Sequence, residues 1–212
     1  MNLFKRFLIF AQSGGMQEAI SYSLNSFKNI FYTNSQTYFM YLHNDTQEDE
    51  AKPDNLDFVF LYSFDEIRKY KFDRLFAYPV EKWFNEGAVC QIGLLENEPI
   101  SFLWIHKKDR KINRAMTVVL AENNYWIGPI FVHKKIRGKG INKAQLNFLL
   151  SNKNYKKSLF ATCTNSENMA SLGSFAKLGF ELSVITRYKK IIFKNSKTDL
   201  IVFKNNIIKY HF

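Results

Sequence analysis

Residues 132–146, VHKKIRGKGINKAQL, constrain the fold most, because two glycines stand among basic residues between a strand-like segment and a helix-like one. The preceding residues 125–131 are rich in aromatic and β-branched side chains, which favour strands. Ile141, Ala144 and Phe148 then recur at helical spacing. A glycine turn at the start of a helix leaves backbone N–H groups unpaired, and the helix dipole adds partial positive charge there. We therefore predict an anion site at this turn, suited to phosphate.

The rest of the chain predicts a mostly antiparallel sheet with flanking helices. Two pairs of apolar runs surround short polar turns and are typical of β-hairpins, one over residues 88–106 and one over residues 115–132, around Glu122-Asn123-Asn124. We expect further strands at residues 37–43, 56–62, 158–164, 185–193 and 200–205, and helices at residues 12–32, from Ser63 or Asp65 onward, 80–84, 141–151 and 168–179. This order indicates an α+β fold, and the sequence carries neither the Walker pattern nor the dinucleotide-binding fingerprint.

Residues 44–55, NDTQEDEAKPDN, form the best internal breakpoint, because they are acidic, contain Pro53 and carry almost no apolar side chain. We expect an exposed loop there. It would divide residues 1–55, an N-terminal extension made of a helix and a strand that packs on or leads into the core, from the main domain at residues 56–212.

The positive charge is concentrated in the last third of the chain. The 212 residues carry a net charge of +11. Residues 1–132 hold 14 Lys and Arg against 16 Asp and Glu, whereas residues 133–212 hold 16 against 3. Such a field attracts anions, whether a nucleotide cofactor, an acidic protein, nucleic acid or anionic lipid. A solvated lysine-rich surface is the alternative for most of these residues.

The two cysteines, Cys90 and Cys163, are far apart in apolar runs, so a disulfide framework and a zinc site have no support. We expect buried free thiols in a reducing compartment. The apolar run at residues 7–11 is short, nothing like a signal-peptide cleavage site follows it, and no run reaches the roughly 20 apolar residues of a membrane span. The expected location is the cytoplasm, with contact between the N-terminus and a membrane surface as the alternative.

Residues 127–150 resemble the acyl-CoA-binding core of the GNAT (N-acetyltransferase) acyltransferase superfamily. Its signature, Arg or Gln, two residues, Gly, one residue, then Gly or Ala, is matched from Arg137 to Gly140. Asn142 departs from it at the last position, although its backbone amide can still donate. A second element, NMASLGSFAKLGF at residues 168–180, is similar to the family's next helix, with Asn, a small residue three positions on, and Gly-Phe.

The resemblance implies a set of residues that hold acetyl-CoA, or another acyl-CoA, with no metal. Strand backbone groups would pair with the pantetheine arm, backbone amides of the turn would hold the diphosphate, and side chains of the later helix would reach the pantetheine amides and a phosphate. In chain order these residues are Ile130, Phe131, Val132, Arg137, Gly138, Lys139, Gly140, Ile141, Asn142, Asn168, Ser171 and Lys177.

The catalytic groups are less defined. Many relatives supply the acid for the departing thiolate from a Tyr seven residues after the helix Asn, where this chain has Phe175. The thiolate would then leave unassisted or with water, Tyr188 or Tyr125 would substitute, or the site is not catalytic. Glu122 and Tyr125 are candidates for the general base, with His133 and His106 at expected strand ends and bulk water as alternatives.

The resemblance implies transfer of an acetyl group to the amine of a small molecule. Aromatic residues 70–84 and the region before Leu56 would build the acceptor pocket, suited to an amino-sugar nucleotide or an amino-acid derivative. Longer acyl chains from acyl carrier protein, an acidic partner, are one alternative. A catalytically silent module that binds anions is another. No nucleic-acid motif is visible, and the C-terminal strands could pair in a homodimer.

Overall fold

The computed structural model of the protein describes residues 16–17, 19–21, 23–24, 32–45, 55–113, 116–191, 197–202 and 209–211. The described residues between 16 and 24 are helical, as the sequence predicts for that part of residues 12–32; the rest of that expected helix lies outside the described residues. So does most of the expected loop at residues 44–55.

The described elements are strands and short helices. The strands are β1 (Tyr32–Asn44), β2 (Leu56–Leu61), β3 (Val89–Leu95), β4 (Glu98–His106), β5 (Arg110–Asn113), β6 (Met116–Val119), β7 (Asn124–Val132), β8 (Ser158–Asn165), β9 (Glu181–Ile191), β10 (Lys197–Val202) and β11 (Lys209–His211). The helices are α3 (Phe64–Arg68), α4 (Val80–Asn85), α5 (Ile141–Ser151) and α6 (Met169–Lys177), with short 3-10 helices at Asp73–Ala77, Lys134–Ile136 and Lys153–Tyr155.

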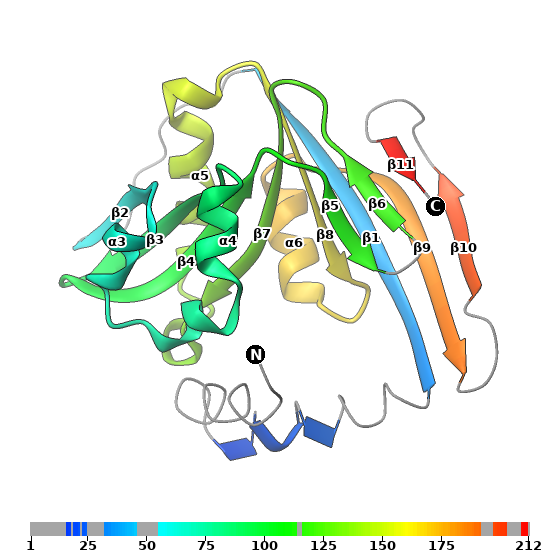
Figure 1. The fold of residues 1–212 in the computed structure, drawn as a ribbon, viewed down its shortest axis with the longest axis horizontal. Helices are drawn as coiled ribbons and strands as arrows, with labels where there is room; N and C mark the ends of the chain where they lie inside the picture. Colours follow the sequence, from blue (N-terminus) through cyan, green and yellow to red (C-terminus); the bar gives the residue numbers. More distant parts are fainter. Residues whose placement is uncertain are drawn as a thin grey trace.

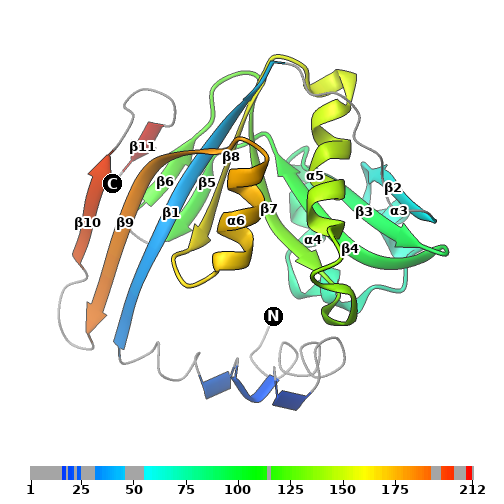
Figure 2. The same cartoon turned by 180° about the vertical axis from the view of Figure 1, so that it is seen from behind.

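One large sheet organises the molecule. Its eight strands run in the order β10-β9-β1-β8-β7-β4-β3-β2, and a second sheet of three strands has the order β11-β6-β5. Only β7 and β8 pair in parallel among the described strands; every other pair is antiparallel. Helices α5 and α6 cover one face of the large sheet, whereas α3 and α4 cover the other (Figures 1 and 2). The predicted α+β fold with a mostly antiparallel sheet is confirmed.

The first strand lies inside the sheet. β1 pairs with β8 on one side and with β9 on the other, both antiparallel. Its residues Phe39 and Tyr41 pack on one face, whereas Met40 packs on the other. A strand that is buried on both faces and paired on both edges joins segments more than a hundred residues apart in the chain, so the expected N-terminal extension supplies part of the sheet itself.

The first predicted hairpin is confirmed and the second is wrong. β3 and β4 pair across a turn in which Glu96 and Asn97 have φ of 53° and 67°, as a two-residue hairpin turn requires. β6, in contrast, does not pair with β7; it pairs with β5 and β11 in the second sheet. The reason is that β7 is an interior strand whose edges are taken by β4 and β8, so β6 finds its partners elsewhere.

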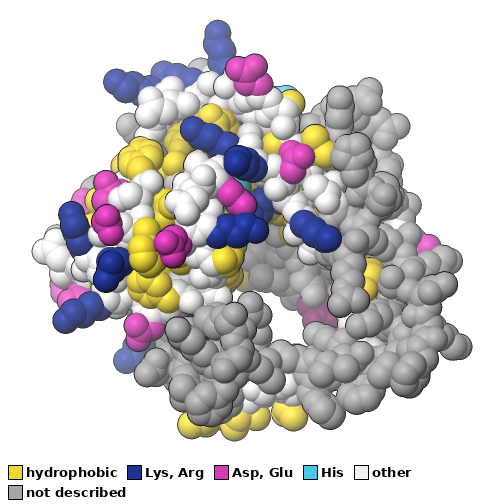
Figure 3. All heavy atoms as spheres, in the orientation of Figure 1, with side chains coloured by type: hydrophobic (Ala, Val, Ile, Leu, Met, Phe, Trp, Pro, Cys, Tyr) yellow, Lys and Arg dark blue, Asp and Glu magenta, His cyan; other side chains and the backbone are white. Residues whose placement is uncertain are grey.

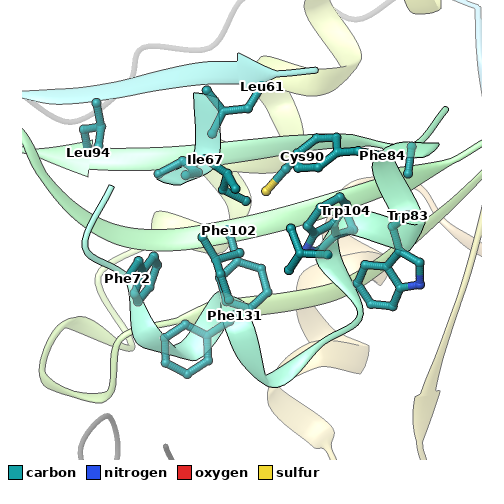
Figure 4. Packing of buried hydrophobic residues seen from close by; sticks show 14 residues of the cluster. Leu61, Ile67, Phe72, Trp83, Phe84, Cys90, Leu94, Phe102, Trp104 and Phe131 are labelled. Carbon is teal, nitrogen blue, oxygen red and sulfur yellow. The ribbon is translucent and has the colours of Figure 1, made fainter. Parts of the chain in front are cut away.

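Alternating side chains divide the core between the two faces of the sheet. On β4, Phe102 and Trp104 point toward α3 and α4 and join the aromatic cluster in Figure 4, where Trp104 meets Trp83 edge-on at 4.9 Å between ring centroids. Leu103 and Ile105 point the other way and pack with α5 and α6. This period of two is the pattern of a strand buried on both faces.

Three buried side-chain amides fasten α5 to the sheet. The side-chain Nε2 of Gln91, on β3, donates to the backbone oxygen of Gln145 at 3.1 Å, and Gln145 Nε2 donates back to Gln91 O at 3.3 Å. At the far end, Asn44 Nδ2 donates to Leu150 O at 2.8 Å and to Tyr155 O at 2.9 Å. Buried polar groups need such partners, and these bonds hold the helix whose first turn forms the predicted anion site.

Candidate functional site

The site begins where β7 and β8 separate. The two strands pair only from Asn124 and Leu159 to Trp126 and Ala161. One residue further on, the Thr162 hydroxyl donates to Ile127 O at 2.9 Å. Beyond this bond no described strand pairs with β7 on its β8 side, and the backbone of the strand faces open space along that edge.

The separation coincides with a bulge in β7. Leu103 of β4 lies opposite Ile130 and Ile105 lies opposite Ile127, so β7 holds one more residue than β4 over this stretch. Gly128, in the extra length, has φ of +123° and a cis peptide bond to Pro129. A bulge bends a strand and re-aims its backbone groups, which turns β7 away from β8.

A cavity of about 950 Å³ opens between the separated strands. It is lined by the second half of β7, the glycine turn and first turn of α5, the end of β8, one side of α6, and three further positions, Thr37, Arg110 and Ile112. The cavity therefore reaches residues from both sheets.

The glycine turn presents the uncapped start of α5 to this cavity. Gly138 and Gly140 have φ of +82° and +76°, a region that costs other L-residues about 1–2 kcal/mol. A Cβ at either position would meet no atom within 4 Å, so backbone conformation rather than space requires glycine here. Gly140 is the N-cap of α5 and supplies no side-chain hydrogen bond, and the first turn holds no acidic residue. These backbone amides are oriented to bind an anion.

The charges around the cavity have one sign. Among the residues that the structure describes, its lining includes the cations Arg110, Arg137, Lys143 and Lys177, and no Asp, Glu or His. Arg137 is held in place, because its Nε donates to Val132 O at 3.0 Å and its guanidinium lies 5.9 Å from the Phe131 ring centroid. Elsewhere the charges mix: over the described surface in Figure 3, Lys and Arg side chains stand among Asp and Glu side chains.

Helix α6 forms the opposite wall. Its N-cap Asn168 accepts a hydrogen bond from Ser171 N at 3.2 Å through Oδ1, which explains why Asn begins this helix. Phe175 lines the cavity but is 3% exposed and packs edge-on against Phe180, with ring centroids 5.0 Å apart. Gly179 ends the helix at φ of +83°, as its sequence predicts.

The model of the acetyltransferase (GNAT) family matches residues 56–180, more than half of the chain. The chain belongs to the GNAT acetyltransferase family. Among curated proteins, none matches it significantly.

Solved structures of low sequence identity share the GNAT fold. A Drosophila protein superposes with a TM-score of 0.53 at 10% identity over 82% of this chain and 56% of its own. A GCN5-related N-acetyltransferase from Kribbella flavida superposes with a TM-score of 0.51 at 10% identity, over 82% of this chain and 64% of its own. A GCN5-related N-acetyltransferase-like protein from Streptococcus suis superposes with a TM-score of 0.51 at 14% identity, over 82% of this chain and 68% of its own. This chain therefore covers less than two thirds of the first two.

The residues predicted to hold acyl-CoA gather at one cavity of this GNAT domain. Eleven of the twelve line it; Lys139 does not, although it lies in the same turn. The chemistry of the cavity also fits a diphosphate joined to a peptide-like arm, because it combines uncapped helix amides, cations without carboxylates and an open strand edge. The contacts of each residue with the cofactor stay predictions.

The three predicted catalytic residues do not line this cavity. Glu122 is exposed in the turn before β7. Tyr125 lines a separate pocket of about 330 Å³, where its ring meets that of Tyr155 edge-on at 5.1 Å. Tyr188 lies on β9, opposite Ser35 of β1. His133 caps the 3-10 helix of the turn by accepting from Lys135 N at 3.4 Å.

The sequence analysis did not identify Arg110 as a site residue, and it did not predict what surrounds His106. His106 is buried, and its Nε2 lies 3.0 Å from Gly128 O; since a carbonyl only accepts, Nε2 carries the proton. Burial, reinforced by the charge of Arg110, lowers the pKa of His106 to about 3, although the bond to Gly128 opposes this. The imidazole is therefore neutral at physiological pH. No sequence signal marked Arg110, because β5 itself was not predicted.

Both cysteines are free thiols, as expected, but only Cys90 is fully buried, whereas Cys163 is half-buried. Cys163 lines the cavity, and burial raises its pKa to about 12, so that its thiol stays protonated. Within the described part of the chain, no group of three or more His, Cys, Asp and Glu side chains could hold a metal ion. Likewise, no helix there is both long and apolar enough to cross a membrane.

Proposed function

We propose that this protein transfers an acyl group, acetyl in the simplest case, from coenzyme A to the amine of a small molecule. One observation carries the proposal: a single cavity collects the uncapped start of α5, the open edge of β7 and the N-terminal part of α6. Along its length, coenzyme A carries a diphosphate, a pantetheine amide chain and a thioester, and these three surfaces would bind them in that order. Membership of the GNAT family supports it.

Each wall of the cavity would bind a different part of coenzyme A. The amides after Gly138 and Gly140 would bind the diphosphate, and Arg137 and Lys177 would add charge-assisted contacts. On the edge of β7 that faces away from β4, backbone groups of residues 130–132 would hydrogen-bond the pantetheine arm as an added strand does; Val132 O, which already accepts from Arg137 Nε, is excluded from this set. When bound, coenzyme A supplies the activated thioester.

Proton transfer would depend on water more than on a dedicated side chain. The described lining residues include no carboxylate and no imidazole, and a phenyl ring stands at position 175, so no conventional base or acid faces the cavity. The acceptor amine would arrive neutral or lose its proton to water. The same observation favours the second candidate, an acyl-CoA-binding module without turnover.

Two acceptor classes follow from the proposal, an amino-sugar nucleotide and an amino-acid derivative, and the acyl donor could instead be acyl carrier protein. Thr37, Ile112 and Trp126 line the same cavity and would contact the acceptor. These finer assignments are open to direct assay.

The test has a binding arm and a turnover arm. Calorimetry with acetyl-CoA, coenzyme A and acyl carrier protein identifies the donor, and release of free thiol over a panel of amines measures transfer. We expect acetyl-CoA to bind and at least one amine to be acylated. Binding without turnover over a broad panel would favour the silent module, whereas absence of any coenzyme A binding would overturn the proposal.

A further inference from the structure

The cavity has a second end that the cofactor residues do not account for. Trp126, at the strand separation, and Val132, next to the glycine turn, are six residue steps apart along β7. At about 3.3 Å per residue this is roughly 20 Å. The end near Trp126 is closed by Arg110 and Ile112 of β5, which comes from the second sheet and lies over the same face as α4 (Figure 1).

Arg110 belongs to the Trp126 end. Its guanidinium carbon lies 5.1 Å from the ring centroid of Trp83, on α4. The Trp83 ring in turn meets His106 edge-on at 4.8 Å, and His106 lies opposite Trp126 and bonds Gly128 at the bulge. These contacts place the cation beside the strand separation, far from the turn that would hold the diphosphate.

The charge of Arg110 has no close partner among the described residues. No described carboxylate lies within ion-pair distance of it; Glu86, whose charge raises the pKa of Arg110, pairs instead with Lys82 at 3.7 Å. Partial burial lowers the pKa of Arg110, which means that the cation has given up water without gaining an equivalent anion. A guanidinium stacked on an aromatic ring keeps its in-plane N–H groups available for a bidentate acceptor.

We propose that Arg110 binds an anionic group, a carboxylate or a phosphate, carried by the acceptor amine. The inference rests on the proposed function and narrows the acceptor to amines that also carry a negatively charged group. Arg137, Lys143 and Lys177 lie on the glycine-turn and α6 walls with the cofactor residues. Arg110 is the remaining lining cation, and it selects the acceptor.

The experiment compares matched amines that differ only in the anion. An amino acid is compared with its amide, and an amino-sugar phosphate with the free amino sugar, under saturating acetyl-CoA. We expect the wild-type kcat/KM to be about 10–100-fold higher for the anionic member of one pair, in line with a charge-assisted hydrogen bond. The pair that shows the preference identifies carboxylate or phosphate.

Two variants and a matched control test the residue itself. In Arg110→Gln, the ratio of kcat/KM for the anionic amine to kcat/KM for its uncharged partner should fall close to one, because the KM of the anionic amine rises. Arg110→Lys should retain part of the preference. Arg68 is the control, because its guanidinium also stacks on a ring, that of Phe64 at 5.7 Å, but on an exposed position away from the cavity. Arg68→Gln should keep the wild-type preference.

The outcomes separate this inference from the proposed function. Turnover of amines without any anion preference, or a preference unchanged in a folded Arg110→Gln, overturns the role of Arg110 and leaves the acyltransferase proposal standing. If Arg110→Gln does not fold, the wild-type substrate pairs and Arg110→Lys still decide it. Failure of every amine would count against the proposed function instead.

Discussion

Replacing Gly140 by Glu tests the glycine turn directly. The residue has φ of +76° and ψ of 1°, and an added Cβ would meet nothing within 4 Å. The stability cost is therefore the left-handed backbone alone, about 1–2 kcal/mol. For a chain of this size that lowers the melting temperature by about 2–8 °C, so the variant should still fold.

The effect on binding should be larger than the effect on stability. A carboxylate about 4 Å from a diphosphate charge is opposed by roughly 1 kcal/mol in water and by about 4 kcal/mol at the effective dielectric of a protein surface. At 1.4 kcal/mol per factor of ten, the Kd of acetyl-CoA should rise by about 5-fold to 1000-fold. Gly140→Asn is the control, because Asn tolerates this conformation without adding charge. It should bind within a few-fold of the wild type.

Calorimetry with acetyl-CoA, together with thermal denaturation of each variant, separates the two effects. Gly140→Glu should melt as one cooperative transition and bind weakly. A folded Gly140→Glu that binds acetyl-CoA as tightly as the wild type would show that the diphosphate does not lie on this turn. The assignment of the whole cavity would then be wrong.

Three further predictions concern stability. Asn44→Ala leaves two buried backbone carbonyls without their donor and should lower the free energy of unfolding by about 2–4 kcal/mol in urea. His106 has a pKa of about 3 in the folded protein and 6.5 as its ordinary value, so the unfolded chain binds the proton more readily. The free energy of unfolding should therefore fall by up to about 1.4 kcal/mol per pH unit as the pH drops from 6.5 toward 3. His106→Gln should remove this part of the pH dependence. Gly93→Ala places a methyl group against the Ser101 hydroxyl and the Phe58 ring and should cost about 1–3 kcal/mol, which Ser101→Ala should partly restore.

Each of these has a clear contrary result. An Asn44→Ala protein as stable as the wild type would mean that water replaces both bonds. Equal acid slopes for the wild type and His106→Gln would place the acid-labile group elsewhere. If Ser101→Ala gives no recovery in the Gly93→Ala background, the overpacking arises at Phe58 rather than at the hydroxyl.

Local features of the fold followed from the sequence because their causes are local. The turn at Glu96 and Asn97, the start of α3 at Ser63, which accepts from Glu66 N at 3.2 Å, and the start of α6 at Asn168 each depend on residues within four positions. The same holds for the glycine turn before α5, whose backbone conformation is one that only glycine adopts freely. Short-range interactions of this kind are visible without coordinates.

Strand pairing did not follow in the same way. The second predicted hairpin joined β6 to β7 because an apolar run, a polar turn and another apolar run stood in order. The pattern does not say that β7 is already paired on both edges, or that β1 enters the sheet between β8 and β9. Those strand pairs join residues far apart in the chain. Whether a pair is stable depends on which apolar faces of the sheet and helices it buries.

The sequence by itself determined the glycine turn, the strand before it and the helix after it, since glycine conformation, capping and periodicity act within a few residues. The positions expected to hold coenzyme A came from the resemblance to the GNAT family and stay a prediction. Only the tertiary structure decided where the proposed acceptor end lies. The separation of β7 from β8, and the meeting of Arg110, Trp83 and His106 beside it, arise from the pairing of distant strands and the packing of a second sheet on the first. Packing of that kind is a property of the whole chain, because each surface is buried only when its distant partner is present.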